Sequence, residues 1–229
     1  MVDSEAVEQR RPILLSWSSG KDSAWALHVL RQRGDVEVVA LLTTINRTVG
    51  RVAMHAVREQ LLELQAEAVG LSLWKIDIPQ KCSDGQYETA MAAAMGGAKA
   101  EGIQAVAFGD LFLPDVRAYR ELKLAGTGIE PLFPLWGLPT ALLAREMVAA
   151  GLRATLTCVD PRVLDRSFAG RAFDGRLLDE LPAGIDPCGE RGEFHTFAWA
   201  GPMFRAPIAI TVGEIVERDG FVFADVIPA

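Results

Sequence analysis

Short apolar runs alternate with longer amphipathic segments along the first two-thirds of the chain. Runs of strand length cover residues 13–17, 36–43, 71–78, 103–109 and 152–159. Segments with helical spacing of apolar residues cover 23–32, 52–69, 86–100, 115–125 and 141–150. The strand runs are almost continuously apolar, as in strands covered on both faces. The alternation therefore predicts an α/β fold, a doubly wound parallel sheet.

The pattern changes after about Pro161. Glycine and proline become frequent, and short runs at 194–200, 207–212 and 221–227 resemble antiparallel strands. Arg218-Asp219-Gly220 suits a hairpin turn before Phe221. We expect a smaller C-terminal α+β region and divide the chain into domains at 1–132 and 133–229.

Composition narrows the class of protein. The 229 residues are 50% hydrophobic and 23% charged, which is ordinary for a globular chain, and the net charge of −7 argues against a broad nucleic-acid-binding surface. No apolar run reaches the roughly 18 residues that a membrane span needs, and the acidic N-terminus is unlike a secretory signal. Three widely spaced cysteines without a Cys-x-x-Cys pair fit a reducing compartment. We expect a cytoplasmic protein with no membrane or nucleic-acid partner.

The chain's clearest candidate for chemistry lies between the first strand and the first helix. The apolar run Leu14-Leu15 ends in Ser16-Trp17-Ser18-Ser19-Gly20-Lys21-Asp22-Ser23, and a helical pattern follows. Backbone N–H groups at a helix N-terminus attract anions. Three hydroxyls (Ser18, Ser19, Ser23), a glycine (Gly20) and a cation (Lys21) add to that attraction. The segment predicts a phosphate or pyrophosphate site, and a serine-rich helix cap is the alternative.

Two common phosphate motifs do not fit. A Walker A loop needs glycine where Leu15 stands and a hydroxyl residue where Asp22 stands. Gly126-Thr127-Gly128 meets Pro131 where a dinucleotide fingerprint needs its third glycine. The segment instead resembles the pyrophosphate loop of the N-type ATP pyrophosphatases, Ser-Gly-Gly-x-Asp-Ser, with Ser19 in place of the first glycine. We expect a negative φ at Ser19, because serine disfavours the left-handed region.

Other strand ends carry candidate ligands, since ligands of open α/β sheets bind at the carboxyl ends of the strands. The backbone at Thr43 and Thr44 can contact an adenine edge, although β-branched residues also simply end strands. Asp110 follows Gly109 at the end of an apolar run, where it can hold Mg²⁺ or cap a helix.

A second polar cluster spans residues 186–197. Glycines bracket Glu190 and Arg191, and Glu193 and His195 then alternate along a predicted strand. Two titratable groups on one strand face can orient an amine or acyl substrate. A glycine-rich turn with a solvated charged edge is the alternative.

Taken together, these segments resemble the diphthine–ammonia ligase family over nearly the whole chain. The resemblance rests on residues 18–23, Gly109-Asp110, the run 117–136 and Gly189-Glu190-Arg191-Gly192-Glu193, where Arg191 departs from the usual asparagine. It implies an adenine nucleotide α-hydrolase-like domain that cleaves ATP to AMP and pyrophosphate, adenylates a carboxylate and uses ammonia to form an amide. The implied cofactors are ATP and Mg²⁺, with 1–132 binding the nucleotide and 133–229 the acceptor.

The resemblance also assigns roles to residues. It implies phosphate binding and catalysis at the first loop, metal or nucleotide binding at Asp110, acceptor binding at the C-terminal cluster, and a nucleotide contact at His55. The residues of the first loop are Ser18, Ser19, Gly20, Lys21, Asp22 and Ser23. Gly109 accompanies Asp110, and the C-terminal cluster consists of Glu190, Glu193 and His195. A solvated helix face is the alternative for His55, and a buried structural thiol is the expectation for Cys188.

Alternative functions remain open at this point. An RNA-thiolating relative would need a cysteine pair and a basic face, and a non-catalytic ATP-binding sensor would not need Glu190 to His195. The acceptor, a small molecule or a protein side chain, is unknown. A homodimer is compatible with the sequence.

Overall fold

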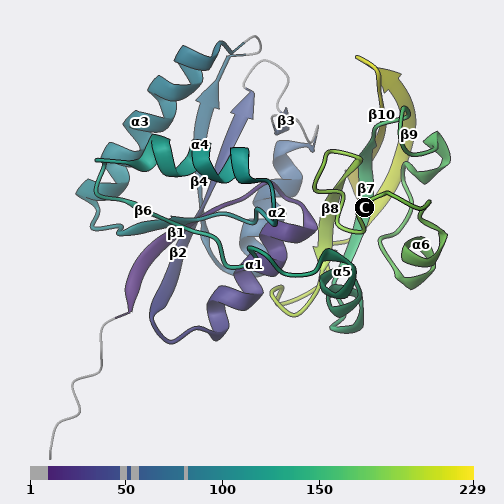
Figure 1. The fold of residues 1–229 in the computed structure, drawn as a ribbon, viewed down its shortest axis with the longest axis horizontal. Coiled ribbons are helices and arrows are strands. Elements are labelled where there is room, and N and C mark those ends of the chain that lie inside the picture. Colours follow the sequence, from purple (N-terminus) through teal and green to yellow (C-terminus); the bar gives the residue numbers. More distant parts are fainter. Residues whose placement is uncertain (1–9, 47–50, 53–56, 80–81) are drawn as a thin grey trace, which may run out of the picture.

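The protein folds into two sheets that lie side by side (Figure 1). This computed structural model describes residues 10–46, 51–52, 57–79 and 82–229. His55 lies outside the described residues, so the expectation of a nucleotide contact there stays a prediction.

The first sheet has six strands, five of them parallel, in the order β3-β2-β1-β5-β6 with β4 on the other edge of β2. The parallel strands are β1 (Arg11–Ser16), β2 (Val36–Asn46), β4 (Ser72–Ile78), β5 (Ala105–Ala107) and β6 (Glu130–Leu132). The short β3 (Arg51–Val52) pairs antiparallel with the end of β2. The predicted α/β fold is confirmed.

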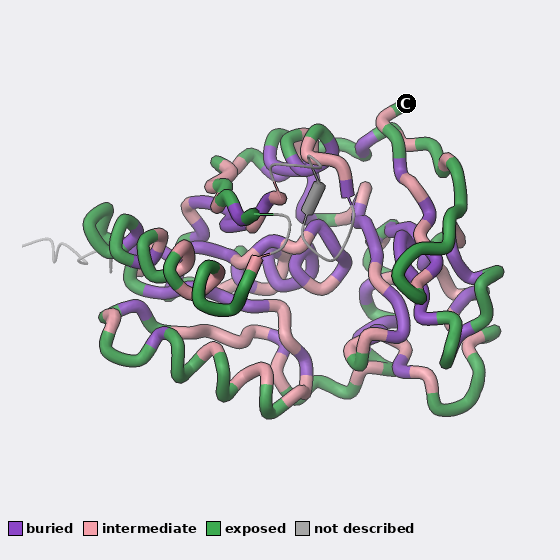
Figure 2. The backbone as a smooth tube through the Cα atoms, turned by 90° about the horizontal axis from the view of Figure 1, so that it is seen from above, coloured by how far each residue is buried: buried purple, intermediate pink, exposed green. Residues whose placement is uncertain are grey.

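Helices cover both faces of this sheet. One face carries α1 (Lys21–Gln32) and α2 (Glu59–Val69), and the other carries α3 (Asp84–Ala100) and α4 (Pro114–Leu124). The two faces have separate apolar cores, because alternate side chains of a strand point to opposite sides: Leu15 joins the α1 side and Leu14 the α3 side. Figure 2 shows buried segments running through the middle of the molecule, with exposed positions on the outer helix turns.

The second sheet is antiparallel, with the order β8-β7-β10-β9. Its strands are β7 (Arg153–Val159), β8 (Phe194–Ala200), β9 (Ile210–Arg218) and β10 (Phe221–Pro228). The helices α5 (Thr140–Ala149) and α6 (Gly175–Glu180) and a 3₁₀ turn at Arg166–Phe168 accompany it.

Two sequence-based expectations about elements were wrong. Residues 152–159 do not extend the parallel sheet: β7 is a central strand of the second sheet, and burial on both sides gives it the same apolar pattern. The fifth parallel strand is instead β6, an edge position that tolerates Pro131. The helix expected from residue 52 begins at Glu59. Val52 instead belongs to β3 and pairs with Ile45 of β2. This pairing is possible because β1 pairs with β2 only as far as Leu42.

The predicted hairpin turn is confirmed. Asp219 and Gly220 connect β9 to β10 with φ values of 52° and 79°. Two successive positive φ values suit the right-handed twist of the flanking strands.

One apolar core continues from the α1 side of the first sheet into the second sheet. Main-chain pairing also joins the two regions, since the Ala198 amide in β8 donates to the Ser19 carbonyl at 2.9 Å. The loop before α1 is therefore built against the second sheet. Among the described residues, no helix has the length and apolarity needed to cross a membrane.

Candidate active site

The serine loop, residues 17–23, connects the end of β1 to α1. The Trp17 amide donates to the Leu42 carbonyl of β2 at 2.7 Å, which fixes the start of the loop. Ser18 Oγ lies 3.2 Å from Ser23 Oγ, and Ser23 Oγ donates to the Gly20 carbonyl at 3.0 Å. Gly20 occupies the N-cap of α1 and brings no capping side chain. The Lys21 amide donates to Thr196 Oγ1 of β8 at 3.1 Å. The loop thus sets hydroxyls around a helix N-terminus whose N-cap residue has no side chain, an arrangement suited to an anion.

Ser19 adopts the left-handed conformation, with φ of 72°. The expected negative φ was wrong, because tertiary hydrogen bonds outweigh the local preference of serine. The Ser19 carbonyl accepts from the Ala198 amide and from Gln65 Nε2, which lies 3.0 Å away. Its hydroxyl is buried and has no partner among the described residues.

Gln65, from α2, is a buried polar residue that sequence reasoning missed. Its Nε2 also donates to the Ala198 carbonyl at 2.6 Å, and its Oε1 accepts from Trp17 Nε1 at 2.8 Å. One side chain of α2 therefore joins two residues of the serine loop to β8. Its only sequence signal is a glutamine among the apolar positions of a helix face.

Lys21 is turned toward the second region. It is 2% exposed, its Nζ donates to Asp22 Oδ2 at 2.8 Å and to the Cys188 carbonyl, and the rings of Phe173 and Phe194 lie 5.5 Å away. Burial alone would lower the pKa of Lys21, but Asp22 and the neighbouring acidic groups raise it above the usual value. Lys21 is therefore a buried cation at neutral pH.

Asp22 has one satisfied oxygen and one orphaned one. Its Oδ2 accepts from Lys21, whereas Oδ1 is buried without a partner among the described residues. A buried carboxylate oxygen without a donor is costly unless a ligand completes it.

Asp110, at the carboxyl end of β5, is held by a residue that sequence reasoning missed. Arg120 of α4 donates to it from Nε at 2.5 Å and from Nη2 at 3.1 Å. The same guanidinium lies 4.3 Å from the ring centroid of Phe108. Gly109 packs against α1: a Cβ there would lie 3.0 Å from the Asp22 carbonyl carbon. Bulkier residues at 109 would push α1 away from β5.

The acidic loop, residues 186–193, covers Lys21 from the second region. Glu193 accepts from the amides of Asp186 and Arg191, each at 3.0 Å, so its carboxylate holds the loop together. Asp186 Oδ2 accepts from the Glu190 amide at 2.8 Å. These hydrogen bonds direct Glu190 toward the first sheet, where its Oε1 accepts from the Leu111 amide at 2.7 Å.

Two titratable groups of this region have shifted pKa values. Burial raises the pKa of Glu190 to about 7, and the Asp22 and Asp110 carboxylates add to the rise. Burial also lowers the pKa of His195 to about 4, and the Lys21 cation contributes. At neutral pH the imidazole is uncharged, while Glu190 exchanges a proton readily.

A cavity of about 220 Å³, the loop cavity, brings most of these groups together. The candidate residues that line it are Ser18, Gly20, Lys21, Asp22, Ser23, Gly109, Asp110, Glu190 and His195, with Arg120 and Cys188 beside them.

Several candidates lie outside the loop cavity. Glu193 turns into its own loop, Ser19 is fully buried, and Thr43 and Thr44 pair with Lys75 and Ile76 of β4. Cys188 is buried, and burial raises the pKa of its thiol well above the usual value, so it stays protonated. Within the described residues no three His, Cys, Asp or Glu side chains form a metal-binding group.

Two family models and several known proteins match the chain. Residues 11–122 match the model of the diphthamide synthase N-terminal domain, and residues 139–224 match that of the C-terminal domain. A diphthine–ammonia ligase from Danio rerio is 30% identical over 188 residues, covering 75% of this chain and 73% of the relative. The Homo sapiens diphthine–ammonia ligase is 26% identical over 231 residues, covering 91% and 86%. The chain belongs to the diphthine–ammonia ligase family, and it is an enzyme of the ligase class.

Proposed function

We propose that this ligase cleaves ATP to AMP and pyrophosphate, activates a carboxylate as an acyl adenylate and converts it with ammonia into an amide. The observation that carries the proposal is the serine loop at the N-terminus of α1, where the N-cap residue Gly20 has no side chain, next to a buried lysine and two carboxylates. Such a site favours a polyanion. It lacks the Walker A pattern typical of γ-phosphate transfer.

The serine loop is assigned to the phosphates of ATP. The hydroxyls of Ser18 and Ser23 and the backbone at Gly20 face the loop cavity. The Ser19 hydroxyl of the same loop is buried and has no partner among the described residues. Lys21 supplies fixed positive charge behind the loop. The adenine is assigned to the end of β2 near Thr43 and Thr44, with His55 as a further candidate.

The residues present fit one divalent cation. The orphaned Asp22 Oδ1 is a free carboxylate ligand, and Mg²⁺ in nucleotide sites often uses one or two carboxylates together with phosphates and water. Asp22 would hold the ion, with Asp110 joining it only if Arg120 releases that carboxylate. Bound there, Mg²⁺ neutralises charge on the phosphate oxygens.

The proposed reaction has two chemical steps, adenylation of the acceptor and formation of the amide. An acceptor carboxylate oxygen attacks the α-phosphorus, its bond to the bridging oxygen breaks, and pyrophosphate leaves. Ammonia then attacks the acyl carbon, the bond to AMP breaks, and the nitrogen loses a proton. Glu190 is assigned as the base that takes this proton, since its pKa of about 7 suits proton exchange. The neutral His195 is assigned to orient the acceptor, and Glu193 to position Glu190 through the acidic loop.

Isotope exchange tests the first stage. The enzyme is incubated with ATP, Mg²⁺, ³²P-labelled pyrophosphate and metabolites from a deproteinised cell extract, without ammonia. We expect label to enter ATP, and added ammonium to suppress the exchange by consuming the adenylate. In a parallel incubation with ¹⁴C-labelled ADP in place of labelled pyrophosphate, entry of label into ATP would indicate an acyl phosphate and overturn the proposal.

A further inference from the structure

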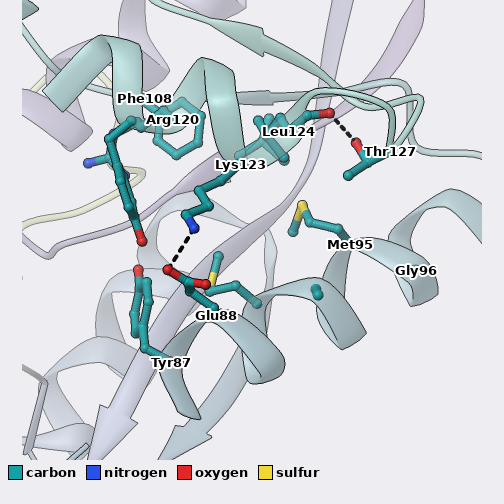
Figure 3. A pocket seen from close by; sticks show the side chains of 13 residues that line it. Tyr87, Glu88, Met95, Gly96, Phe108, Arg120, Lys123, Leu124 and Thr127 are labelled. Atoms are coloured by element: carbon teal, nitrogen blue, oxygen red, sulfur yellow. Dashed lines mark hydrogen bonds and ion pairs between the residues drawn. The ribbon is translucent and has the colours of Figure 1, made fainter. Parts of the chain in front are cut away.

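A second cavity, the helix cavity, lies between α3 and α4 (Figure 3). These helices cover the face of the first sheet whose apolar core is separate from the core shared with the second sheet. Its volume is about 380 Å³, within the range of roughly 300–1,000 Å³ that is typical of small-molecule sites. Its walls are mainly apolar and aromatic, with Tyr87, Met91 and Met95 from α3, Phe108 after β5, and Tyr119 from α4.

The sequence of α3 explains why this space stays open. Ala92 and Gly96 line the cavity where larger side chains would fill the groove between the helices. A Cβ built on Gly96 meets no atom within 4 Å. Glycine inside a helix costs roughly 1 kcal/mol relative to alanine, so Gly96 weakens α3.

The helix cavity shares two wall residues with the loop cavity. Phe108 and Arg120 line both, and the Arg120 guanidinium lies over the Phe108 ring. Arginine has five N–H donors, and Asp110 engages the Nε and Nη2 nitrogens. A second carboxylate at Arg120 would sit at the boundary between an apolar space and the serine loop.

The remaining charges at the helix cavity are paired. Lys123 Nζ lies 2.6 Å from Glu88 Oε1, an ion pair seen as a dashed line in Figure 3. Arg120 is therefore the cation that faces both cavities, and the rest of the wall offers apolar contact. This combination suits a ligand with one anionic end and an apolar or aromatic body.

We propose that the helix cavity binds the body of the acceptor, a monocarboxylic acid with an apolar or aromatic chain, and that Arg120 directs its carboxylate toward the serine loop. The inference rests on the proposed function and names its substrate class. Nucleotide and acceptor then approach the reacting phosphorus from different strands, β2 and β5, so they do not compete for space.

The test uses 4-phenylbutyrate as the probe and compares two neighbouring glycines of α3. Gly96→Leu puts a side chain into the cavity. Gly97→Leu is the matched control, because Gly97 does not line the cavity and its Cβ also meets no atom within 4 Å. Both changes replace a helical glycine with leucine, so both should strengthen α3 equally. Probe binding is measured by calorimetry without nucleotide and again with ATP present, and ATP binding is measured separately.

We expect wild type and Gly97→Leu to bind 4-phenylbutyrate equally, and Gly96→Leu to bind it at least tenfold more weakly with ATP affinity unchanged. The neutral 4-phenylbutanol should bind wild type at least tenfold more weakly than the acid, because it lacks the charge that pairs with Arg120. Equal binding of the acid by both leucine variants, equal binding of acid and alcohol, or no binding to wild type overturns the inference. If ATP competes with 4-phenylbutyrate, the cavity is a nucleotide site and the inference also fails.

Failure of the proposed function has a different signature. Selective loss of probe binding in Gly96→Leu, with no pyrophosphate exchange under any condition, would leave a carboxylate site but remove adenylation. Pyrophosphate exchange with extract metabolites but no probe binding would keep adenylation and remove this cavity as the acceptor site.

Discussion

Gln65 Nε2 donates a hydrogen bond to the Ser19 carbonyl, 46 residues earlier in the chain, at 3.0 Å. This contact holds the serine loop in a conformation that serine does not favour by itself. The same side-chain amide group donates to the Ala198 carbonyl and accepts a hydrogen bond from Trp17 Nε1. The proposed phosphate site is therefore positioned by a buried side chain that does not line the loop cavity.

Gln65→Met should lower the free energy of unfolding by about 3 kcal/mol, because it leaves buried polar groups on Trp17, Ser19 and Ala198 with fewer partners. The KM for ATP should rise as the loop loses its support. Chemical denaturation measures the stability change. Gln60→Met, at an exposed position of the same helix, should change it by less than about 0.5 kcal/mol. Equal effects of the two substitutions would contradict the role of Gln65.

Ser19 tests the backbone conformation of the loop. Ser19→Gly should keep the stability within about 1 kcal/mol of wild type, because glycine accepts a positive φ. Ser19→Val should lose at least about 2 kcal/mol, because a β-branched residue is strained there. Thermal and urea denaturation report both values. A valine variant as stable as the glycine variant would rule out the left-handed loop.

Lys21 and Asp22 form an ion pair whose side chains are 2% and 25% exposed, so the Lys21 single change and the double change should differ sharply. Lys21→Met leaves the Asp22 carboxylate buried without its cation and should cost about 3–5 kcal/mol of unfolding free energy. Adding Asp22→Asn should restore much of that loss, while ATP turnover stays absent in both. For comparison, Arg117 forms an exposed ion pair with Glu121, and replacing Arg117 should lower the free energy of unfolding by less than about 1 kcal/mol. Turnover by the Lys21 variant would exclude it from catalysis.

Glu190 should make stability depend on pH. Its folded pKa of about 7 lies above the ordinary value of 4.5, so between these values the folded protein binds more protons than the unfolded chain. Its contribution to stability is therefore lost as the pH rises from about 4.5 to 7. Glu190→Gln should remove this loss, so the difference between variant and wild type should grow in that window. A pH-independent difference would contradict the raised pKa.

His195 should make stability depend on pH in the opposite direction. Its folded pKa of about 4 lies below the ordinary 6.5, so the unfolded chain binds the extra proton between these values. Wild type should lose stability as the pH falls from about 6.5 to 4, and His195→Gln should lose less. Parallel denaturation midpoints of the two proteins across this range would show that the imidazole is not buried in neutral form.

The sequence predicts those features that depend on neighbouring residues. The strand–loop–helix at Ser18 to Ser23, the β9–β10 turn and the cluster around Glu190 are all visible as local patterns. The contacts of Gln65 with Ser19 and of Arg120 with Asp110 join different elements, and no local pattern reports them. The apolar pattern of residues 152–159 led to their placement in the parallel sheet, because central strands of parallel and antiparallel sheets are both buried on two faces. Glu193 was expected to bind the acceptor, but its hydrogen bonds to the acidic loop depend on backbone amides that a sequence does not position.

The identity of the nucleotide product tests the central claim most directly. Enzyme, Mg²⁺, ammonium and [α-³²P]ATP are incubated with deproteinised extract and, separately, with 4-phenylbutyrate, and the products are separated by chromatography. The account predicts labelled AMP together with one pyrophosphate per AMP, and neither from the Lys21→Met variant. Labelled ADP with inorganic phosphate as the product would contradict it.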